Sequence, residues 1–290
     1  MSDMPVLPTD IWRRTVTFSR HSAVIHAIDC DDTELAEIGS LRSDAVCAVE
    51  DLLCRLIEAE SIAPRVPVWC LGGTSSFDWI DKPIRDLMGA DRRPGFGMWL
   101  PSQRLVVISL RPGLPVQSVI VHELAHAVLG LLTDFFGYPP ALKEGYACLC
   151  ERLFAANWTG SKNWGRGSGP HGYLEPSEII SIADLILCSY SKLIGPAERN
   201  RFRRASCWLV GYLTQIGRER PSILRILAAL RKEGITSPEG VLKWLEGASG
   251  KTLEQMEREF QERCMGPRRF RTRAKGQKAC QDGSSDPSAN

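Results

Sequence analysis

A stretch near the middle of the chain reads Val119-Ile-Val-His-Glu-Leu-Ala-His-Ala-Val-Leu-Gly130. Its only polar side chains are His122, Glu123 and His126, and they stand in an otherwise apolar run of helical character. Four residues at about 100° each bring His126 to within roughly 40° of His122, one turn further along the same helix face. Two imidazoles placed in this way can bind one metal ion, and Glu123 can reach a water on that metal.

A histidine on an apolar helix is more often a core residue with a satisfied hydrogen bond than a metal ligand. Here, however, the chain has only 5 histidines among 290 residues, and two of them fall at this spacing around a glutamate. From composition alone, H-E-x-x-H is expected in roughly one such chain in a few hundred. The pattern therefore favours a metal site.

The composition excludes several classes of partner and location. A net charge of +2 favours no strongly charged partner, and the basic run 267–278 is typical of a solvated tail rather than a nucleic-acid-binding arm. No apolar run approaches the roughly 20 residues that span a bilayer, and the N-terminus lacks the pattern of a secretory signal. Ten cysteines form neither a C-x-x-C motif nor a scaffold pattern, which predicts reduced thiols. We expect a cytoplasmic protein with no membrane or nucleic-acid partner.

The hydrophobic periodicity predicts strands first and helices afterwards. The first part is expected to contain a hairpin of strands over 15–18 and 23–28 joined by a turn, and a third strand over 66–71. Helices are expected over 33–60 and 77–88, and a second hairpin of strands over 96–100 and 104–110. The motif helix, 115–132, is followed by helices over 141–156, 176–193, 197–216, 221–232, 238–245 and 252–264, with a loop over 157–172. The fold class is therefore α+β, with a small mixed sheet and helices over 1–114, a mostly helical portion over 115–265, and a disordered basic tail over 266–290.

A third metal ligand has to come from another element, because a catalytic zinc usually takes three protein ligands and leaves a position for water. A cysteine could serve, but none lies near the motif until Cys148. Apart from Asp134, the next acidic residue is Glu144, which follows His126 by 18 positions. That separation allows the first helix to end and a second to return antiparallel to it.

Together, His122-Glu-Leu-Ala-His126 and Glu144-Gly-Tyr-Ala147 resemble the gluzincin branch of the zincin metallopeptidases. The resemblance covers roughly residues 90 to 264 and includes the predicted hairpin 95–110 and the segment 202–213, but it is specific only at the two motifs. It implies a zincin-like fold and one zinc ion per chain, held by His122, His126 and Glu144. It also implies that Glu123 is the general base for hydrolysis of a peptide or protein substrate.

Supporting residues are less clearly indicated. Glu151 lies seven residues after Glu144 on the same helical face, so it is a candidate to accept the second ring N–H of a histidine ligand, although a surface position explains it equally well. Asp134 is a weaker candidate. Members of that family often carry a tyrosine near the start of the segment that here begins with Phe202, and a phenyl ring cannot donate to an oxyanion. Candidates for that role, each also compatible with a structural role, are Tyr212, Tyr190, Tyr173 and His171.

Three functions are compatible with these patterns. The first is a zinc-dependent peptidase, the second a structural or regulatory zinc-binding relative without hydrolysis, and the third a helical interaction module in which the motif is accidental. The presence of Glu123 favours the first, since a purely structural site has no use for a base.

Overall fold

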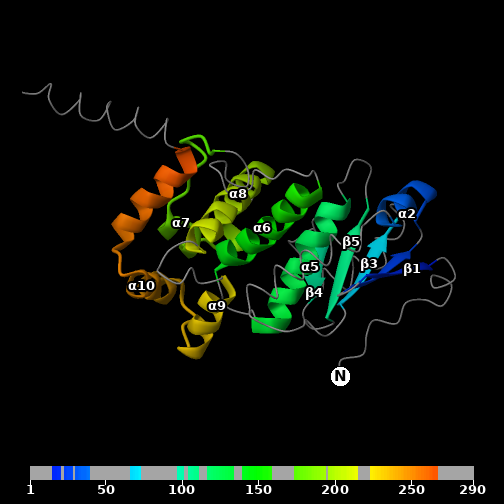
Figure 1. Cartoon of the computed structure of the whole chain (residues 1–290), viewed down its shortest axis with the longest axis horizontal. Helices are drawn as coiled ribbons and strands as arrows, with labels where there is room; N and C mark the ends of the chain where they lie inside the picture. The colour runs from blue at the N-terminus through cyan, green and yellow to red at the C-terminus, as the bar shows by residue number, and fades with distance from the viewer. Residues whose placement is uncertain are drawn as a thin grey trace, which may run out of the picture.

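A five-stranded mixed sheet forms one end of the protein in the computed structural model (Figure 1). Its strands are β1 (Thr15–Arg20), β2 (Ala23–Ile28), β3 (Val66–Leu71), β4 (Gly97–Leu100) and β5 (Leu105–Ser109), in the order β1-β2-β3-β5-β4. The three inner strands are parallel, and each outer strand is antiparallel to its neighbour. The structure describes residues 15–20, 23–28, 30–39, 66–72, 97–100, 104–110, 116–133, 139–158, 173–193, 195–214 and 223–266.

The three inner strands are apolar on both faces, because successive strand residues point to opposite sides and most residues of β2, β3 and β5 are buried. One face joins the main core through Ala23, Ile25, Ala27, Val66, Val68, Cys70, Val106 and Ile108. The other forms a smaller cluster of Ile28, Trp69, Leu71, Leu100, Leu105 and Val107. Such burial on both sides explains why β5 reads as an uninterrupted apolar run.

Helices make up most of the remaining described chain. They are α2 (Asp32–Gly39), α5 (Val116–Thr133), α6 (Pro140–Trp158), α7 (Ile182–Leu187), the 3₁₀ turn η1 (Tyr190–Lys192), α8 (Pro196–Leu213), α9 (Ile223–Lys232), α10 (Pro238–Ser249) and a last helix over 253–266. In Figure 1, α5 lies against the sheet, α6 against α5, and α8 against α6. Since both its sides are covered, α5 is apolar around nearly its whole circumference.

The packing of α6 on α8 depends on Gly145. A Cβ atom at this position would lie 2.2 Å from the backbone oxygen of Ser206 and 2.7 Å from a methyl group of Val210. Only glycine permits so close an approach of the two helices, so the residue after Glu144 sets the distance between α6 and α8.

The prediction of an α+β protein with a small mixed sheet and a mostly helical C-terminal part is confirmed. Both predicted hairpins form, although the strands of the second begin one residue later than expected. Within the described residues, no helix has the length and apolar character needed to cross a bilayer. The predicted boundary at residue 114 remains a prediction.

One helix prediction was wrong. A single helix was expected over 176–193, but residues 173–181 have no regular helix, and α7 starts only after Ser181, whose hydroxyl accepts the N–H of Asp184 at 2.9 Å. The extended backbone of Cys188 ends α7 after Leu187. The predicted helix 33–60 beyond residue 39, the helix 77–88, the loop after residue 158 and the tail from residue 267 lie outside the described residues.

Candidate metal centre

The first two motif residues lie in the protein interior because α5 is enclosed by the sheet and α6. His122 and Glu123 are only 6% and 8% exposed, while His126 is partly buried. Burying such groups is costly unless they find partners. The neighbouring elements supply polar partners for all three.

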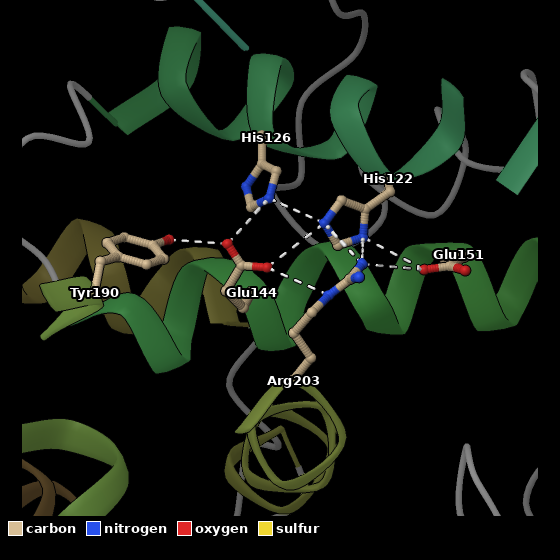
Figure 2. Close-up of polar contacts among 6 residues, drawn as sticks. All are labelled: His122, His126, Glu144, Glu151, Tyr190 and Arg203. Atoms are coloured by element: carbon tan, nitrogen blue, oxygen red, sulfur yellow. Dashed lines mark hydrogen bonds and ion pairs between the residues drawn. The ribbon is translucent and has the colours of Figure 1, made fainter. Parts of the chain in front are cut away.

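Glu144 of α6 faces both histidines of α5 (Figure 2). Its Oε2 lies 3.6 Å from Nε2 of His122, and its Oε1 lies 3.6 Å from Nε2 of His126. The two Nε2 atoms are 3.2 Å apart. Two imidazole nitrogens and a carboxylate from two antiparallel helices therefore converge on one point, as the sequence pattern predicted for the ligands.

These separations fit a tetrahedral metal ion. Bonds of about 2.1 Å at tetrahedral angles separate neighbouring ligand atoms by roughly 3.4 Å. The two Nε2 atoms are 3.2 Å apart and each lies 3.6 Å from a different oxygen of Glu144, so one ligand atom from each residue lies within 4.8 Å of the others and the three could hold one ion. Two imidazoles with one carboxylate form a donor set typical of catalytic zinc.

The protonation of two of the three groups also suits metal binding. Burial lowers the pKa of His126 to about 4, so its imidazole is neutral at physiological pH. Burial alone would raise the pKa of Glu144, but the two histidines and the guanidinium of Arg203 outweigh it and hold that pKa far below the usual range. An ionised carboxylate and a free imidazole lone pair are therefore available.

Glu123 is not one of the converging groups and lies instead against the edge strand β4. A Cβ atom on Gly97 would lie 2.6 Å from Cγ of Glu123, so a glycine is needed at this point of the strand. The backbone N–H of Trp99 donates to its carboxylate. Burial raises the pKa of Glu123 to about 7, with Glu144 contributing in the same direction and His122 opposing it.

The opposite side of His122 faces a second acidic group. Nδ1 of His122 lies 3.4 Å from Oε2 of Glu151, the residue that the helical spacing had suggested as a support for a ligand. Cys148, also on α6, is buried beside the same ring and forms a second group with His122 and Glu151. Glu151 therefore lies where a carboxylate can orient the imidazole while Nε2 binds a metal.

Sequence reasoning missed Arg203 of α8. Its Nη2 lies 3.0 Å from Nδ1 and 3.2 Å from Nε2 of His122, and the same side chain forms ion pairs with Glu144 and Glu151. The one signal available in the sequence was its position directly after Phe202, in the segment to which the resemblance had directed attention.

The oxyanion candidates have different surroundings. The hydroxyl of Tyr190 donates to Oε1 of Glu144 at 2.9 Å, which brings it to the candidate ligands (Figure 2). The hydroxyl of Tyr212 donates to Glu259 at 3.2 Å, and the ring of Tyr173 stacks on Trp208. His171 and Asp134 lie outside the described residues. Of the candidate tyrosines, Tyr190 is the one that the structure joins to a metal ligand.

A comparison with models of known protein families finds no match to this chain, and a comparison with curated proteins finds none of significant sequence similarity.

Proposed function

We propose that the protein is a zinc-dependent peptide hydrolase of the gluzincin type, and that its sheet and the pair α5–α6 form a zincin-like fold. The observation that carries the proposal is the convergence of His122, His126 and Glu144, at separations close to those of a tetrahedral site. Each of these residues matches the motif position that binds zinc in that family.

The second support is the position of Glu123. A purely structural metal site gains nothing from a further carboxylate buried beside its first ligand, since an unpaired buried charge is costly. Glu123 is held by the backbone of β4 and adjoins His122 in sequence, so its carboxylate is oriented but is not part of the ligand set. That arrangement suits a residue that accepts and donates a proton as a general base and acid.

The chemistry follows from these positions. When bound, zinc polarises the substrate carbonyl and lowers the pKa of a coordinated water to about 7. Glu123 accepts the proton of the attacking water and delivers a proton to the leaving amine nitrogen. The carboxylate of Glu151 lies 3.4 Å from Nδ1 of His122, where it can keep the imidazole in the orientation needed for binding. Tyr190 holds Glu144 and is a candidate donor to the developing oxyanion.

The substrate is proposed to lie along β4. This strand is at the edge of the described sheet, and its residues Gly97 and Trp99 adjoin Glu123. An extended peptide can pair with such an edge through backbone hydrogen bonds, which would bring a peptide carbonyl past the base.

The decisive test measures metal content and peptide cleavage on the same purified protein. We expect about one zinc per chain and cleavage of a peptide library that a chelator abolishes and added zinc restores. Glu123→Gln should bind zinc and lose nearly all cleavage, because an amide cannot accept the proton. Glu254→Gln, the same change at an exposed position on the last helix, should remain fully active.

Two outcomes would contradict the proposal in different ways. Tightly bound zinc without turnover on a broad library would identify a structural or regulatory zinc-binding protein. Absence of any transition metal from protein purified without chelator would make the motif accidental.

A further inference from the structure

We infer that Arg203 is a positioning residue of the metal centre, joining the ligand His122 on α5 to the carboxylates Glu144 and Glu151 on α6. The inference rests on the metal-binding part of the proposed function. Nothing in the H-E-x-x-H or E-G-x-A patterns requires an arginine at this place.

The contacts of Arg203 bring a third helix into the site. The side chain reaches from α8 past α6 to the histidine on α5 (Figure 2). Its Nε lies 3.6 Å from Oε2 of Glu144, and its Nη2 lies 3.8 Å from Oε2 of Glu151 and 3.0 Å from Nδ1 of His122. One planar group thus touches a ligand carboxylate, the carboxylate beside the imidazole, and the imidazole itself.

The site needs such a group because it gathers negative charge in a poorly solvated region. Glu144 and Glu151 lie on the same face of α6 and approach the same ring of His122. Two carboxylates held near each other repel and tend to take up protons or separate. A guanidinium remains charged at every physiological pH, and here it forms ion pairs with both carboxylates, which favours holding them in one arrangement.

Removing Arg203 should change metal affinity in opposite directions, depending on whether the residue positions the ligands or acts only through its positive charge. A guanidinium acting only through its charge repels a metal cation, so its removal should tighten binding. A positioning residue keeps Glu144 and His122 facing each other, so its removal should weaken binding, typically about 10- to 100-fold for residues that orient ligands. Glu144 and Glu151 pair with Arg203 and balance much of its charge, so the second effect should dominate.

The experiment compares zinc affinity in four full-length proteins, measured by competition with a chromophoric chelator. Arg203→Met should bind zinc about 10- to 100-fold more weakly than wild type. Arg203→Lys should have an intermediate zinc affinity, because lysine keeps the positive charge but lacks the planar guanidinium that contacts both carboxylates. The control is Arg204→Met, since Arg204 is the next residue on α8 but pairs with Glu178 instead, and it should match wild type.

Two further measurements separate a change at the site from a loss of structure. Circular dichroism reports folding, and the visible spectrum of the Co²⁺-substituted protein reports the geometry of the ligands. We expect the spectrum to change in Arg203→Met and to be unchanged in Arg204→Met. If Arg203→Met does not fold, the zinc affinity of Arg203→Lys still shows whether the site needs a guanidinium that contacts both carboxylates or only a positive charge.

The inference is overturned if Arg203→Met binds zinc as tightly as wild type or more tightly, or if Arg203→Lys recovers wild-type affinity completely. A wild-type chain that binds no zinc would instead refute the proposed function, so the two failures are distinguishable.

Discussion

Replacing Gly145 by alanine should destabilise the protein, although alanine is the better helix former. The residue lies within α6, and its added Cβ would stand 2.2 Å from the backbone oxygen of Ser206. Real Cβ atoms essentially never come closer than 3.0 Å to such an atom, so α6 and α8 would have to separate by about 0.8 Å. The obstacle belongs to the backbone of a helix and cannot rotate away.

The magnitude follows from two opposing terms. Glycine to alanine in a helix interior gains about 1 kcal/mol from propensity. Forcing an extra methyl group into a packed interface costs about 1–3 kcal/mol, and a backbone obstacle places Gly145→Ala at the upper end. We expect a net loss of about 1–2 kcal/mol in the free energy of unfolding. Zinc affinity should fall as well, since Glu144 is the preceding residue.

Urea unfolding monitored by circular dichroism measures the first effect, and chelator competition measures the second. Gly211→Ala on α8 is the matched control, because no atom lies within 4 Å of its added Cβ. This control should stabilise the protein by about 0.5–1 kcal/mol. If Gly145→Ala were as stable as wild type, or shifted stability in the same direction as Gly211→Ala, the close approach of α6 and α8 would be refuted.

Three further changes test the site and two helix ends. Tyr190→Phe removes the hydroxyl that donates to Glu144 and should lower zinc affinity about tenfold at unchanged helix content, as measured by chelator competition and circular dichroism. Ser237→Ala removes the cap on the N–H of Gly240 and should cost about 1 kcal/mol in urea unfolding. Gly250→Ala should cost about 1–2 kcal/mol in the same assay, since its φ of 66° is unfavourable for alanine; equal stability would exclude that conformation in solution.

Most of the fold could be predicted because it follows from local periodicity. The alternation and apolar runs at 15–28 and 96–110 indicated two hairpins, and both form. The segment 176–193 is the exception. Ile182, Leu185 and Ile186 have helical spacing and form the buried face of α7, but spacing alone could not show that the helix stops at Leu187.

The sequence identified those site residues that lie close together in the chain or that match a known motif. Glu144 was assigned through its resemblance to a family motif, and the structure brings it to both histidines. Arg203 could not be identified from the sequence, because its role depends on contacts with residues of two other helices. A contact between residues 81 positions apart has no periodic signal.

By itself, the sequence determined that His122 and His126 share a helix face with Glu123 beside them, because the α-helix fixes the geometry of residues four apart. It also determined that this helix is buried, since its apolar residues surround it on nearly all sides. The tertiary structure alone decided what surrounds the pair. The docking of α8 on α6 at Gly145 brings in Arg203, and the turn after α7 brings Tyr190 to Glu144. These contacts depend on how closely whole helices pack, and that distance is set by side chains far apart in the chain.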